Sequence, residues 1–480
     1  MRKATIEQDD LQGNILAAYG NDFAQALYAF VKIEDPVAGR RWLGDLVGDV
    51  RNAERWSPKP HQALNVAFTA DGLRALAVPE RVLDTFPEEF RQGMGTADRA
   101  RRLGDTGPSA PEHWERGLRR GDFNALVTIA AQQSDVLEQR REALTAQLSG
   151  IGSGLALVYE QPAALITDSQ HGLIAREHFG FADGLAQPSI DAKGLEPRSK
   201  AGPHRRDGQG TPVKPFPFTR IPLKRNRWQP VAPGEFVLGY RDENGVLPAA
   251  PADPLGRNGS FMVLRKLEQH VASFTRYLRQ AANGDPELEE LLAAKIVGRW
   301  KDGTPVMQSP KRPPRMRKED EQQRIDRINN FRYASDPIGR TCPLGAHIRR
   351  ANPRDAFSPW EGLLTKRHRI IRRGMPYGPA PAEPAVEDHE ERGLMFVCYQ
   401  ASIARQFEVI QEHWCNDGDP FGLGDEKDVL LSDEDPDGTM SLPGCEPRFL
   451  KPRPSFVTLR GGGYLFAPGL AALRALSAGI

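Results

Sequence analysis

Two side chains that could do chemistry stand in glycine-rich surroundings far apart in the sequence. Asp183 lies in Phe179-Gly180-Phe181-Ala182-Asp183-Gly184, and His347 lies in Gly345-Ala346-His347-Ile348-Arg349. Glycine lets the backbone approach a bulky or flat group without a Cβ clash. A carboxylate can take up a proton, and an imidazole nitrogen can bind a metal. Together they predict a two-sided cofactor pocket, although Asp-Gly is also a common turn pair in which the aspartate only caps its own loop.

The segment around Asp183 has the pattern Gly-x-x-Asp-Gly from Gly180 to Gly184 and continues as Leu185-Ala186-Gln187-Pro188-Ser189. It resembles the signature of the dye-decolorizing peroxidases, haem proteins in which a haem-ligating histidine follows much later. Residues 345–354 resemble the segment with that histidine, and residues 370–378 resemble the segment with the distal arginine. Residues 393–403 and 10–16 also resemble family segments. The resemblance therefore runs nearly from end to end.

The resemblance implies a role for each segment. His347 would be the axial ligand of the iron of haem b, because an imidazole nitrogen binds haem iron and leaves the opposite face open. Asp183 would be the base that moves a proton between the two oxygens of peroxide. Arg372 would stabilise negative charge on the departing oxygen. Arg373 is the competing choice, since only one of the two neighbours can face the iron, and a solvated arginine in a basic run is the simpler alternative.

A carboxylate base has a consequence for the pH dependence of the enzyme. An ordinary carboxylate stays ionised down to about pH 4, whereas a histidine base is protonated below roughly pH 6.5. Asp183 as the base therefore predicts activity that favours acidic pH. The sequence does not place the carboxylate or carbonyl that would hold the other ring nitrogen of His347.

The resemblance also implies which residues border the haem. Arginine side chains and backbone N–H groups commonly bind carboxylates such as the haem propionates. Leu394 and Phe396 would wall the distal side and limit it to ligands of the size of peroxide. The full expected set of cofactor contacts is Gly184, Leu185, Ala186, His347, Arg349, Asn352, Pro353, Arg354, Arg372, Leu394 and Phe396.

By this resemblance the protein is a haem peroxidase that reduces hydrogen peroxide and, through a ferryl-oxo intermediate, oxidises dyes, phenols or another organic electron donor. The alternative is a haem-binding or iron-handling protein, similar to a deferrochelatase, that holds haem without turnover. The two differ in peroxide reactivity, which in the second case would not exceed that of free haem. A homo-oligomer is compatible with either interpretation.

The composition is that of a soluble enzyme and excludes some other classes. The 480 residues are 39% hydrophobic and 26% charged, which is enough to bury a large core. A net charge of +1 gives no reason to expect nucleic-acid binding. Four cysteines without Cys-x-x-Cys spacing do not make a disulfide framework. With an acidic amino terminus and no apolar run long enough to span a bilayer, we expect a cytoplasmic protein that does not bind membranes.

The apolar pattern predicts two sets of four strands. The first set is 26–33, 64–69, 125–130 and 155–160, with a helix at 134–148. The second set is 235–240, 261–267, 394–399 and 463–466, with helices after Lys266 and after Ala401. This repeated plan agrees with the α+β fold that the resemblance implies: two ferredoxin-like domains, similar to a dimeric α/β barrel, with antiparallel sheets, peripheral helices and haem in the C-terminal domain.

These elements divide the chain into two expected domains. The N-terminal ferredoxin-like domain spans 1–192 and carries the Gly-x-x-Asp-Gly loop at its end, and the C-terminal haem domain spans 234–480. Two segments rich in Pro, Gly or basic residues do not fit the repeat, 193–233 and 302–336. We expect both to be surface insertions.

Overall fold

The computed structural model describes residues 4–17, 19, 22–149, 153–167, 175–193, 195, 230–313, 321–357, 363–432, 438–443, 447–450 and 455–480. Within this part of the chain no helix is long and apolar enough to cross a membrane.

The centre of the molecule is one antiparallel sheet of nine strands, to which both halves of the chain contribute. The strand order is β10-β12-β9-β15-β3-β4-β2-β5, with β11 beside β12. The N-terminal half contributes β2 (Gln25–Ile33), β3 (Gln62–Phe68), β4 (Ala125–Ala131) and β5 (Leu155–Ala164). The C-terminal half contributes β9 (Ser260–Gln269), β10 (Ile371–Arg372), β11 (Met375–Tyr377), β12 (Gly393–Gln400) and β15 (Val457–Ala467). The halves join where Phe466 of β15 pairs with Phe68 of β3.

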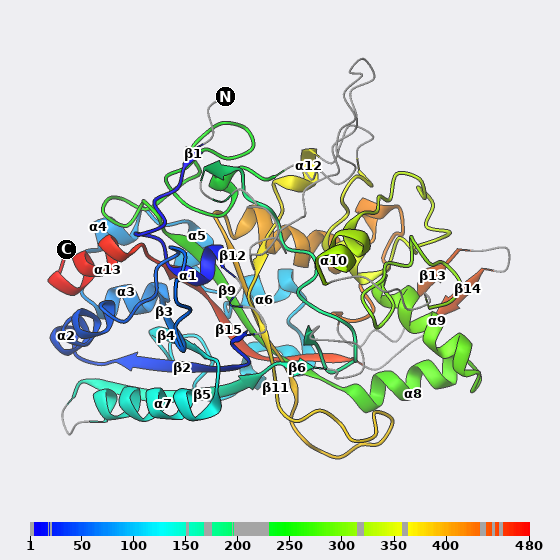
Figure 1. The fold of residues 1–480 in the computed structure, drawn as a ribbon, viewed down its shortest axis with the longest axis horizontal. Coiled ribbons are helices and arrows are strands. Elements are labelled where there is room, and N and C mark those ends of the chain that lie inside the picture. The colour runs from blue at the N-terminus through cyan, green and yellow to red at the C-terminus, as the bar shows by residue number, and fades with distance from the viewer. Residues whose placement is uncertain are drawn as a thin grey trace.

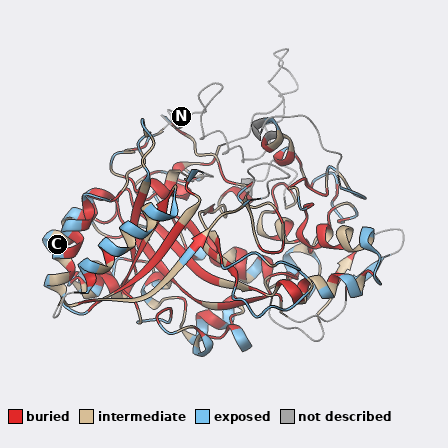
Figure 2. Ribbon diagram, turned by 60° about the horizontal axis from the view of Figure 1, so that its bottom comes forward, coloured by how far each residue is buried: buried red, intermediate tan, exposed pale blue. Residues whose placement is uncertain are grey.

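Both faces of the sheet are buried, and this explains the apolar runs in its strands (Figure 2). Side chains alternate between the faces of a strand. In β2, Leu27, Ala29 and Val31 pack into the core on one face, while Tyr28 and Phe30 pack into the core on the other.

Helices cover the sheet and form the two ends of the molecule (Figure 1). One end holds α2 (Pro36–Val47), which begins at Asp35, whose side chain accepts a hydrogen bond from the Ala38 N–H. The other end holds α9 (Pro286–Val297), which ends at Gly298 in the left-handed conformation, with φ +92°. The remaining α-helices are α1 (Gly13–Leu16), α3 (Ala70–Ala75), α4 (Glu80–Leu83), α5 (Glu88–Gln92), α6 (Ala97–Leu103), α7 (Ser134–Leu148), α8 (Val271–Ala281), α10 (Glu321–Asn329), α11 (His347–Ala351), α12 (Leu363–Lys366) and α13 (Leu470–Ala478).

Smaller elements complete the described chain. A helix with π-type hydrogen bonding, η6 (Ala404–Cys415), follows β12, and short 3-10 turns include η5 (Pro233–Glu235). Three two-stranded pairs lie outside the main sheet: β1 (Ala4–Thr5) with β8 (Ala192–Lys193), β6 (Ile166–Thr167) with β7 (Ala175–Arg176), and β13 (Met440–Leu442) with β14 (Arg448–Leu450).

The α+β fold class expected from the sequence, with antiparallel strands and peripheral helices, is confirmed, and so are seven of the eight expected strands and the helix at 134–148. The strand expected at 235–240 is wrong. The segment starts with η5 and continues in turns, because Val237 bonds back to the Pro233 carbonyl and Gly239 has φ +87°. Its apolar residues Val237 and Leu238 are nevertheless fully buried. The prediction was wrong because a short buried apolar run does not by itself distinguish a strand from buried turns.

The segment 302–336 differs from the surface insertion expected for it. Val306, Ile328 and Tyr333 are completely buried, and Phe331 lines the main pocket. Through Phe331, the described part of this segment therefore contributes to the wall of the candidate site. The other expected insertion, 193–233, lies almost entirely outside the described residues.

Candidate active site

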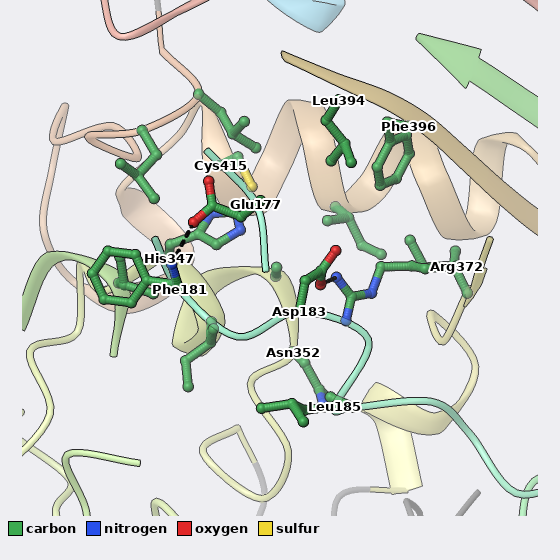
Figure 3. Close-up of a pocket in the computed structure, with 18 of the residues that line it drawn as sticks. Glu177, Phe181, Asp183, Leu185, His347, Asn352, Arg372, Leu394, Phe396 and Cys415 are labelled. Atoms are coloured by element: carbon green, nitrogen blue, oxygen red, sulfur yellow. Dashed lines mark hydrogen bonds and ion pairs between the residues drawn. The ribbon is translucent and has the colours of Figure 1, made fainter. Parts of the chain in front are cut away.

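One pocket of about 270 Å³ brings together the segments that the sequence analysis singled out. Its lining comes from residues 177–186, from β9 and β12, from α11, from residues 368–372 and from η6. His347 lies on one side of the pocket and Asp183 with Arg372 on the other (Figure 3). The tertiary structure thus assembles a two-sided pocket from both halves of the chain.

The Gly-x-x-Asp-Gly loop is held by a buried carboxylate. Glu177 accepts hydrogen bonds from the N–H groups of Phe179 and Phe181, both at 2.8 Å, and from Gln269 Nε2 at 2.6 Å. Burial raises the pKa of Glu177 to about 7, although these three donors favour its ionised form. All the contacts of Glu177 serve to shape the loop that presents Asp183.

The two glycines of the motif are required by backbone conformation. Gly180 has φ +91° and Gly184 has φ +72°, which other residues rarely adopt. A Cβ at Gly184 would meet no protein atom within 4 Å. The left-handed conformation therefore selects glycine at both positions, and the open space beside Gly184 leaves room for the close approach of a bound group that the sequence predicts.

Asp183 and Arg372 form an ion pair inside the pocket. Arg372 Nη1 donates to Asp183 Oδ1 at 2.9 Å. Burial opposes the charge on Asp183, but the Arg372 guanidinium and the N–H of Gly184 outweigh it and hold the pKa of the carboxyl below its ordinary value. Asp183 is therefore a carboxylate with a partner that keeps it ionised.

The neighbouring Arg373 points elsewhere. Its guanidinium donates to the carbonyl oxygens of Asn14 and Ile15, at 2.8 and 3.2 Å, on the opposite side of the strand. Consecutive side chains of a strand point to opposite faces, so only one of the pair can enter the pocket. The geometry selects Arg372 of the two arginines that the sequence left open.

His347 opens α11 and is held by a carboxylate that sequence reasoning missed. Its Nδ1 lies 2.8 Å from Oδ2 of Asp428, which is completely buried. Asp428 Oδ1 also accepts from the N–H of Leu430 at 2.8 Å. Burial alone would lower the pKa of His347, but Asp428 outweighs it and raises the pKa. No pattern in the sequence marks Asp428, because it stands 81 residues away in a loop.

No hydrogen bond of the described residues occupies the other ring nitrogen of His347, Nε2, so this nitrogen remains for a ligand in the pocket. A second histidine, His368, also lines the pocket. Its Nδ1 faces the backbone carbonyl of Arg405, and its ring packs edge-on against Trp414. A ring held by a carboxylate is the more basic ligand, which favours His347 over His368.

Four further arginines line the pocket: Arg265, Arg299, Arg354 and Arg369. Arg265 forms an ion pair with the buried Asp105, and the other three bring further positive charge to the lining. Burial lowers the pKa of Arg299 and Arg369 to about 9 and that of Arg354 to about 10, and Arg354 repels the other two. The sequence analysis had only Arg354. Arg299 follows Gly298 at the end of α9, and neither its spacing nor its neighbours distinguish it from a surface arginine.

The other expected cofactor contacts separate into two groups. Leu185, Ala186, Asn352, Leu394 and Phe396 line the pocket, whereas Gly184, Arg349 and Pro353 do not. Arg349 is turned into the protein interior, where it donates to Asp336 and to the Cys342 carbonyl and stacks 4.6 Å from the Tyr333 ring centroid. These buried contacts tie α11 to the segment with Asp336 and Cys342.

Two family models match the chain. Residues 10–159 match the DyP dimeric alpha+beta barrel domain, and residues 241–422 match the C-terminal domain of Dyp-type peroxidases. Among curated proteins, the chain is similar to a dye-decolorizing peroxidase of Exidia glandulosa, with 28% identity over 98% of this chain and 87% of that protein. It is also similar to the multifunctional dye peroxidase DyP2 of Amycolatopsis sp., with 29% identity over 99% of this chain and 97% of that protein.

Solved structures extend the similarity to three dimensions. A fungal DyP-type peroxidase from Auricularia auricula-judae superimposes with a TM-score of 0.79 at 26% identity, covering 99% of this chain and all of that one. A dye-decolorizing peroxidase in complex with 2,6-dimethoxyphenol gives a TM-score of 0.76 at 26% identity, covering 98% of this chain and all of that one. A deferrochelatase of Yersinia pestis is 40% identical, but over only 17% of this chain.

Proposed function

The chain belongs to the dye-decolorizing peroxidase family, and from this we propose that it uses haem b to reduce hydrogen peroxide and to oxidise organic donors such as dyes and phenols. One observation carries the proposal. A histidine held by a carboxylate faces, across a single pocket, a carboxylate paired with an arginine.

The residues present fit a haem. The lining is mainly apolar, His347 offers one ring nitrogen, and the positive charges of Arg299, Arg354 and Arg369 suit an anionic group. Haem has this same combination of properties, a flat apolar ring with iron and two carboxylates. We assign His347 as the iron ligand, Arg299, Arg354 and Arg369 as partners of the propionates, and Leu185, Ala186, Asn352, Leu394 and Phe396 as the walls. The ligand and most of these residues belong to the C-terminal half, which we propose as the haem domain.

Bound haem would supply the electrons that reduce peroxide and then take them back from the donor. The protein has to supply proton transfer. Asp183 has the geometry of a base in the pocket, and its depressed pKa keeps it ionised and ready to accept a proton from hydrogen peroxide. The same carboxyl can return that proton to the departing oxygen, which then leaves as water.

Arg372 has two tasks in this proposal. It keeps Asp183 ionised through their contact at 2.9 Å. Its delocalised positive charge also stabilises negative charge on the departing oxygen. Asp428 also has a task in this proposal. Its hydrogen bond fixes the orientation of the His347 ring and makes the other ring nitrogen a stronger electron-pair donor to a metal.

The experiment that tests the proposal is an absorption spectrum of the haem-loaded protein before and after one equivalent of hydrogen peroxide. We expect a rapid shift of the Soret band that reverses when a dye or 2,6-dimethoxyphenol is added. Haem binding without this shift would support the alternative, a haem-handling protein without turnover. Failure to retain haem would contradict both.

The pH dependence of the peroxide step should report Asp183. Because its folded-state pKa lies below the ordinary aspartate value, the rate should persist in acid and fall only as the pH drops through that lowered pKa. The stability that the ion pair contributes is likewise present above the unfolded pKa, about 3.9, and lost as pH falls through the folded one. Stopped-flow rates from about pH 2.5 to 8 measure this. An acid limb near pH 7 would instead implicate Glu177, whose pKa is about 7.

Replacing Asp428 with asparagine should weaken haem binding but leave part of the protein loaded with haem. The amide can still accept from His347 Nδ1–H, but it carries no charge, and loss of such a partner typically costs about 10- to 100-fold in metal affinity. Transfer of haem to apomyoglobin gives the dissociation rate. Asp336→Asn is the control, since this buried aspartate pairs with Arg349 outside the pocket. Equal haem loss in both variants would reduce the role of Asp428 to general stability.

A further inference from the structure

Gln187 makes an unusual pair of contacts with the backbone of Arg372. Its Oε1 accepts from the Arg372 N–H at 3.0 Å, and its Nε2 donates to the Arg372 carbonyl at 3.0 Å. The side chain is 7% exposed, so these bonds are shielded from water. Gln187 lies only four residues after Asp183, on the same continuous segment.

The position of Arg372 in the sheet explains what this amide replaces. β10 is the outermost strand in the order, and Arg372 stands opposite Cys398 of β12. The next residue, Arg373, donates its N–H to the Val397 carbonyl at 2.7 Å. Because hydrogen bonds alternate along an antiparallel strand, the backbone N–H and carbonyl of Arg372 point away from β12. The N–H and carbonyl of Arg372 therefore face the position where the next strand of the sheet would lie. The side-chain amide of Gln187 occupies that position.

A second contact ties the same two segments together. Arg369 Nη2 donates to the carbonyl of Ala186 at 3.1 Å. The loop with Asp183 and the strand with Arg372 are therefore joined at two neighbouring points, by one side chain from each segment. The ion pair between Asp183 and Arg372 is the third point. Arg373 Nη1 also donates to the Arg372 carbonyl, at 3.0 Å, which adds to the hold on this residue.

We infer that Gln187 is a positioning residue for the peroxide step, which holds Arg372 in register with Asp183 by acting as a one-residue substitute for a neighbouring strand. The inference rests on the proposed function, since it gives the distal pair its alignment. Misplacement of a catalytic group by about 1 Å can cost about 100-fold in rate. A two-residue strand at a sheet edge has few other bonds to fix it.

The chain contains a matched control for this contact. Gln12 makes the same two-point contact with Val66, whose N–H donates to Gln12 Oε1 at 3.0 Å and whose carbonyl accepts from Gln12 Nε2 at 2.7 Å. Gln12 is completely buried and does not line the pocket. Gln12 Nε2 also donates to the Pro468 carbonyl at 3.0 Å, so Gln12→Leu gives an upper value for what the loss of such a contact does to stability.

The first test compares Gln187→Leu with Gln12→Leu and wild type, all loaded with haem. We expect Gln187→Leu to retain haem and to slow the peroxide step by about 10- to 100-fold. We also expect its dissociation constant for fluoride, read from the absorption spectrum of the ferric protein, to rise about tenfold, because an anion on the open face loses the aligned guanidinium. Gln12→Leu should lower the melting temperature and leave the rate and the fluoride affinity near wild type. Equal rates and fluoride affinities in the two variants would overturn the inference.

The second test uses the isosteric variant Gln187→Glu, which also covers the case in which Gln187→Leu does not fold. The ionised carboxylate accepts from the Arg372 N–H but cannot donate to its carbonyl, whereas the protonated acid does both. The rate relative to wild type at the same pH should therefore recover as the pH falls. A ratio that does not change with pH contradicts the inference. If wild type does not react with peroxide at all, the proposed function fails, and the fluoride comparison still decides the role of Gln187.

Discussion

The His347→Ala variant is expected to lose haem. The variant removes Nε2 of His347, the ring nitrogen that remains for a ligand because Asp428 holds Nδ1. The apolar walls and the arginines of the pocket cannot replace a bond to iron. Haem occupancy after gel filtration should fall at least about tenfold, and activity should fall with it. Absorbance at the Soret band against protein absorbance measures the occupancy. Added imidazole should restore part of it by filling the space left by the side chain.

The control for this prediction is His368→Ala, because His368 is the other histidine of the described lining. Its ring packs against Trp414, and its Nδ1 faces the backbone carbonyl of Arg405 rather than a carboxylate. We expect this variant to keep haem and its spectrum. Haem loss in His368→Ala together with full occupancy in His347→Ala would reverse the assignment of the ligand.

Asp183→Asn should keep haem and slow the peroxide step by about 100- to 10,000-fold, the range for loss of a positioned acid–base group. Asparagine has the same shape and can still accept from Arg372 Nη1, so the pocket should keep its form. It cannot take up the proton. Stopped-flow mixing of the haem-loaded variant with hydrogen peroxide measures the rate, and the unmixed spectrum confirms the occupancy.

The pocket contains a second carboxylate that makes this prediction specific. Glu177→Gln removes the charge of Glu177, whose oxygens accept from the N–H groups of Phe179 and Phe181 and from Gln269. Because an amide N–H₂ cannot accept these bonds, the variant should lower the melting temperature more than Asp183→Asn does. Its peroxide rate, measured on the folded fraction, should fall less. A larger loss of rate in Glu177→Gln would make Glu177 the base.

The strands of the sheet were predictable because their signal is local. The segments that became β2, β9 and β12 each contain an apolar run of at least four residues, which is typical of strands buried on both faces. The segment 235–240 has the same composition but no strand, since its turns depend on contacts with Gly259 and Arg241. That all these strands form one sheet through Phe466 and Phe68 depends on a contact between residues 398 positions apart.

The residues of the site divide in the same way, into those marked by a local sequence pattern and those defined by a distant partner. Motif residues could be named in advance because Asp183, His347 and Arg372 each stand in a segment with a recognisable pattern. Asp428, Arg299 and Arg369 stand in no pattern that marks them, and Gln187 stands beside the motif without a role that the motif assigns, since its partner is distant in the sequence. Arg349 stands in a motif yet faces Asp336 and the interior.

The sequence by itself determined the family, the α+β fold class and the two opposed groups of the pocket, because these depend on residue types at fixed short spacings. The tertiary structure alone decided which of Arg372 and Arg373 meets Asp183, which carboxylate holds His347, and that Phe331, in a segment expected to be a surface insertion, lines the pocket. The physical reason is that the direction of a side chain and the identity of its partner follow from the strand register and from long-range packing. Neither is encoded in the neighbouring residues.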